Sequence, residues 1–247
     1  RSSVENSMHA PHGTAADNSN LNYQFFAVEV RQADVVVSEF MTSLMQPGSA
    51  NPIPANYRGN NKTDETARFN FLFNTTSVGV QPNTEDGFAA QVAPAPLVTY
   101  QENLLILAEA GLRSQGFQTG IEELNDFRAF MNGGGYMMNI DPANLNYEPY
   151  TAADFASGGI ENLDGLSEDN ALLREILEER YVTFFGLIQP FNDLRRTLNE
   201  TNVRVPVEPS SGNTLPQRFL YPQTEIDRNE NAPSPIPDFF EPTDINS

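Results

Sequence analysis

Apolar residues at helical spacing are concentrated in three stretches of this chain, and long segments rich in Pro, Asn and Gly separate them. The first stretch runs from residue 98 to 116, the second from 119 to 131, and the third begins after Ser167. Apolar side chains three and four residues apart share one face of a helix, and that face has to be buried against another element. The pattern predicts a mainly α protein with long irregular loops.

The first two stretches are expected to form one antiparallel helix pair over residues 98–132. Small residues at Ala108, Ala110 and Gly111 would let the two helices approach closely. At about 34 residues the pair resembles one tetratricopeptide-type unit. A single unit does not bury its own outer faces, so further helices must cover it. They would come from the rest of this chain or from a larger α-helical domain.

The segment before the helix pair, residues 1–97, is expected to be loop-rich with one helix. Apolar spacing places that helix from about Gln32 to Met45, and Pro47 ends it. The remainder, including residues 47–98, is rich in Pro, Asn, Gly and Thr and is predicted to be irregular.

The segment after the pair, residues 133–247, is expected to contain loops, one strong helix and an extended tail. Ser167 is the predicted N-cap of that helix, since Glu168 and Asp169 follow it at the positive end of the helix dipole. A shorter helix is predicted after Pro190, and the tail is predicted to begin near Asn231.

Charge and composition exclude several classes of partner. The chain carries 33 acidic and 14 basic residues, a formal net charge of −19, which disfavours nucleic acid and anionic membrane surfaces. It has no cysteine, so disulfides, zinc–thiolate sites and thiol catalysis are excluded. No run of eighteen apolar residues occurs, so no membrane-spanning helix is predicted.

Metal and cofactor sites find little support in the sequence, and no cofactor is expected. The two histidines, His9 and His12, are predicted to lie in a loop without a third ligand. Structural calcium is the one alternative, through carboxylate oxygens of Asp141, Asp154 and Asp164 in Asn- and Asp-rich loops.

Carboxylates are too numerous for any pair to indicate a catalytic site, so we expect that the protein is not an enzyme. Glu175, Glu178 and Glu179 are interpreted as members of solvated helix faces and local ion pairs. Arginines and acids are dense over residues 174–196, and forks between them are expected to lock two adjoining helices at a fixed angle.

Three sequence blocks follow one another between residues 98 and 229. The first is Val98-Thr-Tyr-Gln-Glu-Asn-Leu-Leu-Ile-Leu-Ala-Glu-Ala110, and the second joins Ile176-Leu-Glu-Glu-Arg-Tyr-Val-Thr-Phe-Phe-Gly186 to Phe191-Asn-Asp-Leu-Arg-Arg196. The third is Arg218-Phe-Leu-Tyr-Pro-Gln-Thr-Glu-Ile-Asp-Arg-Asn229. In this order the blocks resemble the carboxy-terminal half of the SusD/RagB family of surface lipoproteins.

The resemblance implies a SusD-like fold and a nutrient-binding protein on the cell surface of Bacteroidetes-type bacteria. Such a protein captures oligosaccharides, or in some relatives peptides, and delivers them to a SusC-like TonB-dependent transporter in the outer membrane. It also implies that the chain is part of a longer protein, lipid-anchored through a cysteine upstream of these residues, which would be its membrane contact.

Sugar capture in this family relies on aromatic faces and on polar side chains that bind hydroxyl groups. Because the chain has no Trp, the loop tyrosines Tyr57, Tyr136, Tyr147 and Tyr150 are the candidate ligand-binding residues, with packing or plain surface as the alternative for each. Two other functions stay open: a helical-repeat adaptor that binds a protein and no small molecule, and a hydrolase that uses loop carboxylates.

Overall fold

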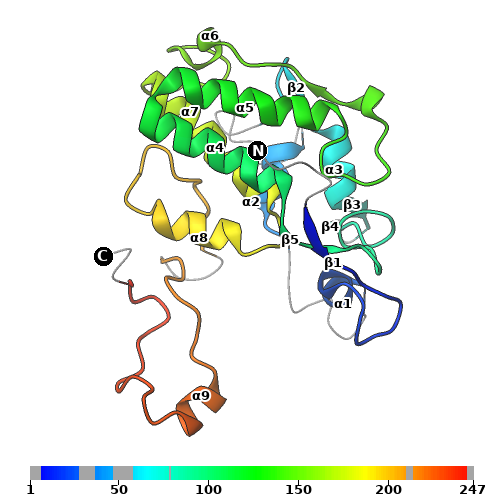
Figure 1. Cartoon of the computed structure of the whole chain (residues 1–247), viewed down its shortest axis with the longest axis vertical. Helices are drawn as coiled ribbons and strands as arrows, with labels where there is room; N and C mark the ends of the chain where they lie inside the picture. The colour runs from blue at the N-terminus through cyan, green and yellow to red at the C-terminus, as the bar shows by residue number, and fades with distance from the viewer. Residues whose placement is uncertain (1–6, 28–36, 47–57, 78, 210–213, 244–247) are drawn as a thin grey trace.

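The computed structural model describes residues 7–27, 37–46, 58–77, 79–209 and 214–243, and in these residues the protein is mainly helical (Figure 1). The helices in chain order are α1 (Leu21–Phe26), α2 (Glu39–Met45), α3 (Thr66–Leu72), α4 (Tyr100–Gln115), α5 (Phe117–Asn132), α6 (Ala152–Phe155), α7 (Glu168–Thr183), α8 (Gln189–Arg196) and α9 (Gln223–Arg228), with a 3₁₀ turn, η3, at Pro142–Asn144. None of the helices in these described ranges is long and apolar enough to cross a membrane.

The strands of the described residues are short and pair as three separate antiparallel ribbons. The pairs are β1 (Met8–Ala10) with β5 (Ala95–Val98), β2 (Thr63–Asp64) with β6 (Asn146–Tyr147), and β3 (Phe73–Thr76) with β4 (Gly79–Pro82). Each ribbon ties two segments of the chain together, and β3 and β6 add Phe73 and Tyr147 to the core that the helices form.

The helix pair α4–α5 is confirmed, and Thr99 and Gly116 set its boundaries. The Thr99 hydroxyl caps α4 by accepting from the Glu102 amide, and Gly116, at φ +96°, reverses the chain directly into α5. Figure 1 shows the two helices lying side by side along their length. The apolar face of α4 is fully buried at Leu104, Leu105 and Ala108.

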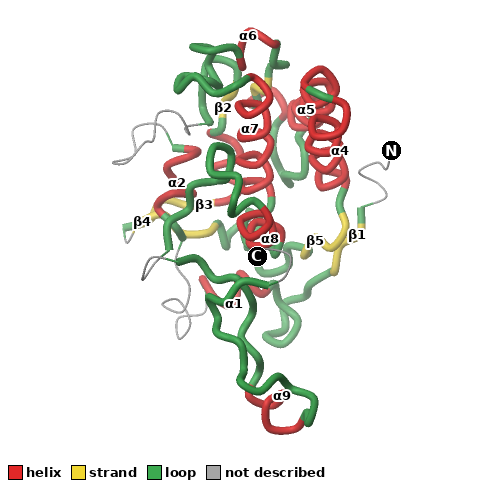
Figure 2. The backbone as a smooth tube through the Cα atoms, turned by 90° about the vertical axis from the view of Figure 1, so that its left-hand side faces the viewer, coloured by secondary structure: helices red, strands yellow, loops and turns green. Residues whose placement is uncertain are grey.

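Helix α7 covers the inner face of this pair, so the rest of the chain supplies the partner that the sequence required. Figure 2 shows α7 beside α4 and α5, with α2 on its other side. Ser167 caps α7 as predicted, by accepting from the Asn170 amide, and Leu172, Ile176 and Leu177 lie in the common core.

Several segments expected to be loop are instead ordered elements. The apolar residues between 69 and 73 form the inner face of α3 and the start of β3. Strand β1 and helix α1 also lie in the segment that was expected to be irregular. Elements this short produce no sustained periodicity, so the sequence pattern missed them. The helix predicted over 32–45 is observed as α2 from Glu39, and residues 32–36 lie outside the described residues.

The chain from 217 to 242 leaves the body as an arm that carries α9 at its tip (Figures 1 and 2). Its two limbs are joined near the body, where the Gln217 amide donates to the Phe239 carbonyl and Arg218 donates to the Pro242 carbonyl. No residue of α9 is buried. From Asn231 to residue 243 the chain is irregular, with several turns, and it returns to the base of the arm.

Glycine at position 120 is required by the close approach of α4 and α5. A Cβ added to Gly120 would lie 2.6 Å from the Leu112 Cβ and 3.2 Å from a Leu172 methyl group. Alanine is the better helix former by about 1 kcal/mol, but an overpacked core costs about 1–3 kcal/mol. We expect Gly120→Ala to lower the free energy of unfolding, measured by urea denaturation, by about 1 kcal/mol.

Ala129→Gly is the matched control, because Ala129 is exposed on the same helix and changes propensity alone. Ala129→Gly should lower the free energy of unfolding by about 1 kcal/mol. A gain for Gly120→Ala as large as this loss would show that the two helices are not in tight contact.

Candidate functional site

The expected fork network between adjoining helices is confirmed, and it joins α4, α7 and α8. Asp193 on α8 accepts from Arg180 Nε of α7 at 2.8 Å and from Arg196 Nε at 2.8 Å. Arg196 also donates to both carboxylate oxygens of Glu109 on α4, at 2.5 and 2.6 Å. Burial favours the neutral acid, but the hydrogen bonds from Arg196 outweigh it and lower the pKa of Glu109.

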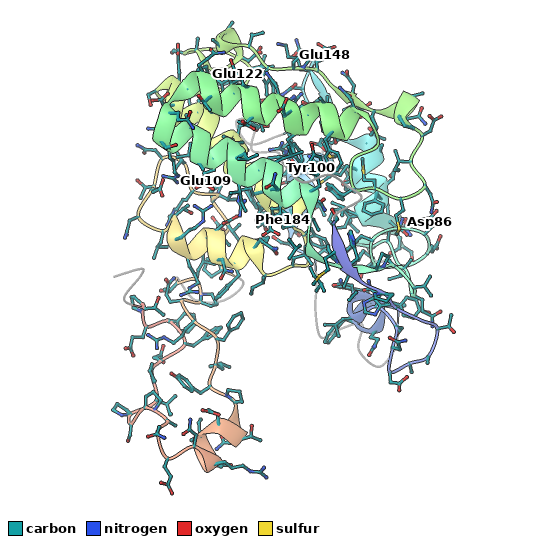
Figure 3. The ribbon with its side chains drawn as sticks, viewed as in Figure 1. Asp86, Tyr100, Glu109, Glu122, Glu148 and Phe184 are labelled. Atoms are coloured by element: carbon teal, nitrogen blue, oxygen red, sulfur yellow. The ribbon has the colours of Figure 1, made fainter. Side chains whose placement is uncertain are left out.

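These contacts unite two of the blocks that carry the family resemblance. Glu109 belongs to the Ala-Glu-Ala of the first block, and Arg180, Asp193 and Arg196 belong to the second. Figure 3 labels Glu109 on α4 above α8. These motif residues therefore hold three helices together.

A second charged network lies wholly inside the protein, on the opposite side of α7. Arg58 donates to both oxygens of Glu175 at 3.2 and 3.0 Å and also pairs with Glu179. Arg68 pairs with Glu65 and donates to Glu179 Oε1 at 2.5 Å. Burial alone would raise the pKa of Glu179, but the two arginines overcome it and lower the pKa to about 2.

The interpretation of Glu175, Glu178 and Glu179 as solvated residues is wrong. All three side chains are buried, because α7 is enclosed by α4 and α5 on one side and by the 58–72 segment on the other. Only the tertiary structure brings Arg58 and Arg68 to these carboxylates, from more than a hundred residues away.

The same surroundings raise the pKa of a further acid, Glu161. It accepts from the Tyr150 hydroxyl at 2.5 Å and from the Asn60 amide at 2.6 Å. Burial, together with the negative charge of Glu175, raises the pKa of Glu161 to about 8. The protonated form is therefore favoured at neutral pH, beside a tyrosine that itself belongs to the core.

The structure places the candidate tyrosines mostly in the core and not on a binding surface. Tyr147 is 0% exposed and Tyr150 is 3% exposed, and the Arg128 guanidinium lies 3.7 Å from the Tyr150 ring centroid. Rings enclosed in this way have no face for a sugar, so the packing alternative holds for both. Tyr136 is half-buried with its ring edge toward Phe71, and Tyr57 lies outside the described residues.

The three aspartates considered for calcium are engaged in other contacts. Asp154 accepts from Lys62 Nζ at 2.6 Å, Asp164 from Arg174 Nη1 at 2.6 Å, and Asp141 from the Ala143 amide at 3.0 Å. His9 lies on β1 and not in the predicted loop, whereas His12 lies outside the helices and strands, as predicted. No group of three or more metal-ligating side chains occurs in the described parts of the chain.

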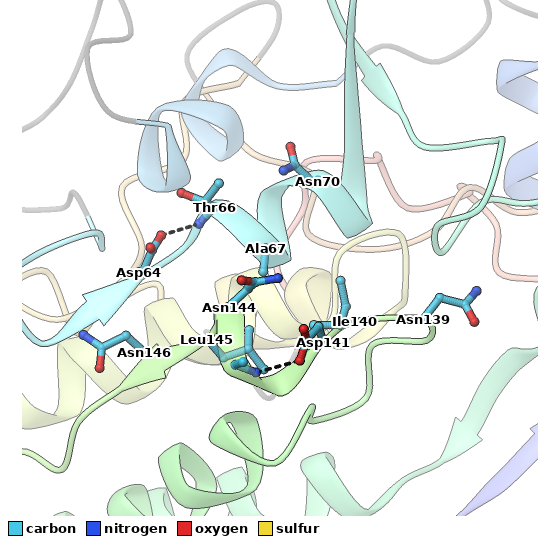
Figure 4. Close-up of a pocket in the computed structure, with 11 residues that line it drawn as sticks. Asp64, Thr66, Ala67, Asn70, Asn139, Ile140, Asp141, Asn144, Leu145 and Asn146 are labelled. Atoms are coloured by element: carbon cyan, nitrogen blue, oxygen red, sulfur yellow. Dashed lines mark hydrogen bonds between the residues drawn. The ribbon is translucent and has the colours of Figure 1, made fainter.

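A groove of about 640 Å³ lies between α3 and the loop that carries η3 (Figure 4). This volume falls within the range of roughly 300–1,000 Å³ typical of small-molecule sites. The lining residues are Asp64, Thr66, Ala67, Asn70, Asn139, Ile140, Asp141, Ala143, Asn144, Leu145 and Asn146. We call it the amide groove, because asparagine is its commonest lining residue.

The loop of the amide groove is held by its own backbone. The Asn144 amide donates to the Asp141 carbonyl at 3.0 Å, and the Leu145 amide donates to the Pro142 carbonyl at 3.1 Å. Past the groove, Asn132 on α5 exchanges two hydrogen bonds with the backbone of Tyr147. The side chains of the loop are therefore presented from a fixed backbone, which lowers the entropy lost on binding a ligand.

The sequence offered only a weak signal for this site. Residues 139–146 are rich in Asn and Asp, and they were considered for metal binding through Asp141 alone. Their partner across the groove, Asn70 on α3, is about seventy residues away in the chain, and no local pattern links the two.

A second and smaller cavity of about 220 Å³ lies where the arm joins the body. Its lining is mixed: Leu194, Val205, Leu215 and Phe240 are among the apolar residues, and Arg204, Thr214 and Gln217 are polar.

Glu161→Gln tests the raised pKa of Glu161. The folded-state pKa of Glu161, about 8, lies above its ordinary value of 4.5, so the folded protein binds this proton more tightly than the unfolded chain. The stabilising contribution is complete below about pH 4.5 and is lost as the pH rises to about 8. Urea midpoints should therefore fall more for the wild type than for Glu161→Gln between about pH 5 and 8.

Glutamine at 161 keeps the oxygen that accepts from Tyr150 and Asn60, so the variant retains both hydrogen bonds. Glu122→Gln, on the exposed side of α5, is the control for the loss of one charge. Equal pH slopes for the wild type and Glu161→Gln would show that Glu161 is not held in its protonated form.

Comparison with known proteins assigns no family to this chain. No family model matches it, and no curated protein sequence matches it. Its function has to be inferred from the motif blocks, the helical architecture and the chemistry of the amide groove.

Proposed function

We propose that this protein is a SusD/RagB-like nutrient-binding protein of the bacterial cell surface. It captures oligosaccharides or peptides and delivers them, without chemical change, to a SusC-like TonB-dependent transporter in the outer membrane. A lipid anchor upstream of these residues holds it to the membrane. The α4–α5 pair is its tetratricopeptide-type unit.

One observation carries this proposal: residues from two of the three blocks that produce the family resemblance meet in space. Glu109 of the first block contacts Arg196 of the second, and Asp193 joins Arg196 to Arg180. Motifs that matched by chance would have no reason to form one hydrogen-bonded unit across 87 residues of chain. The network supports a scaffold shared with the SusD/RagB family. Ligand binding would then depend on residues at the surface.

The distribution of acids supports a protein without catalytic activity. Three carboxylates of α7, Glu175, Glu178 and Glu179, are buried between α7 and its neighbours. A general acid or nucleophile has to reach its substrate, and these groups are enclosed. The open amide groove offers polar groups suited to binding.

The adaptor alternative rests on the arm. Phe219 and Leu220 are 65% and 70% exposed, and Phe191 stacks near Phe219 at the base of the arm. Exposed apolar side chains on a projecting segment are typical of protein interfaces. In the nutrient-binding protein this arm would contact the transporter, whereas in an adaptor it would contact a soluble protein.

Titration calorimetry on the full-length protein, against a panel of oligosaccharides and peptides, tests the proposal. We expect saturable heat with one glycan class and no product after prolonged incubation, checked by chromatography. Heat with peptides alone would place the protein in the peptide-capturing branch. If no compound of the panel gives saturable heat, the adaptor function is favoured. Formation of any product would contradict the proposed absence of catalysis.

A further inference from the structure

The amide groove presents neutral groups that both donate and accept hydrogen bonds. Its four asparagines are Asn70 on α3 and Asn139, Asn144 and Asn146 on the opposite loop. Within the described residues, none of these four side-chain amides makes a hydrogen bond to the protein. Each amide offers two N–H donors and one oxygen acceptor, so a ligand hydroxyl can pair with either end.

The floor of the groove is apolar and firmly supported. Ile140 and Leu145 are half-buried and pack against the hydrophobic core, and Ala67 lies on the facing side of α3. A pyranose ring has hydroxyls at its rim and C–H groups on its faces, and aliphatic side chains can cover such a face. The combination of amide rim and aliphatic floor fits a polyhydroxylated ring.

Charge restricts the ligand further. The lining contains two carboxylates, Asp64 and Asp141, and no Lys, Arg or His. The two cations nearest along the chain are both engaged elsewhere: Lys62 pairs with Asp154, and Arg68 pairs with Glu65 and Glu179. At physiological ionic strength charges are screened within about 8 Å, so these two carboxylates act on a ligand inside the groove. An anionic ligand would meet repulsion without any compensating cation.

We propose that the amide groove binds neutral oligosaccharides and discriminates against acidic ones such as uronic-acid oligomers. This inference deepens the proposed function and rests on it, since it names the nutrient class and the site that takes it. Selectivity arises from Asp64 and Asp141, and affinity arises from the asparagine amides above the aliphatic floor.

The carboxylates can be neutralised without disturbing the backbone. The Asp64 carboxylate accepts from the Thr66 amide at 2.9 Å, and the Asp141 carboxylate accepts from the Ala143 amide at 3.0 Å. Asparagine keeps the oxygen that makes each of these contacts and removes only the charge. The double substitution Asp64→Asn with Asp141→Asn therefore isolates electrostatics.

The test is titration calorimetry of the full-length protein with neutral hexose oligosaccharides and with uronic-acid oligosaccharides of the same length. We expect the neutral series to bind and the acidic series to bind at least roughly tenfold more weakly. Asn144→Ala with Asn146→Ala should weaken neutral binding roughly tenfold or more, since each lost hydrogen bond contributes about 1 kcal/mol. Asp64→Asn with Asp141→Asn should raise affinity for the acidic series and leave the neutral series unchanged.

Asn199→Ala, at an exposed asparagine after α8 and outside the groove, is the matched control. Thermal unfolding of each variant verifies that it is folded. If the groove substitutions leave the affinity for neutral oligosaccharides unchanged, this inference is overturned. The proposed function would then stand, with its binding site elsewhere. Stronger binding of the acidic series by the wild type would also overturn it. Absence of saturable heat with every oligosaccharide would overturn both the groove assignment and glycan capture.

Discussion

The pairing of Arg58 and Arg68 with carboxylates of α7 is the interaction on which the rest of the structure depends. It places several full charges where no water reaches, and removing one partner of a buried pair typically costs about 3–5 kcal/mol. Glu179 accepts from both arginines and from Thr183, so its charge is fully compensated. Hydrophobic packing tolerates small shifts of a helix, whereas this network defines one position for α7 relative to the 58–72 segment.

Because α7 is fixed on that side, its other faces can organise the remaining helices. Leu172 and Ile176 pack into the core shared with α4 and α5, and Arg180 engages Asp193 of α8. Helix α8 in turn reaches α4 through Arg196 and Glu109. A single helix thus links two charged networks through an apolar centre, which explains why its charged residues are as deeply buried as its leucines.

The amide groove lies outside these networks but depends on them. Its α3 wall carries Arg68, which is anchored to Glu179, and its loop wall leads into β6, where the Tyr147 hydroxyl donates to Glu65 at 3.1 Å. Both walls therefore end in the same buried cluster. The surface can carry unengaged polar side chains for a ligand because the rigidity of the walls comes from the interior.

The sequence by itself determined the three long helices, the N-cap of the third at Ser167, and the forks between α7 and α8. Each of these depends on residues within a few turns of one another, where apolar period and side-chain spacing act directly. The sequence also predicted small residues at the α4–α5 contact, among them Gly111. Gly120, which the pattern did not indicate, lies in an equally close contact. The family resemblance lies in the same local segments.

Only the tertiary structure decided which charges are buried, where the tyrosines lie and what faces the amide groove. The local sequence predicts Glu175 and Glu179 to be surface residues, but Arg58 and Arg68 pair with them in the interior. Tyr147 and Tyr150 lie in loop-like sequence, yet both are buried in the core. Asn70 and Asn144 share a groove although no local pattern connects them. The physical reason is common to all: burial and charge compensation depend on contacts between distant segments, and periodicity reports only on neighbours in the chain.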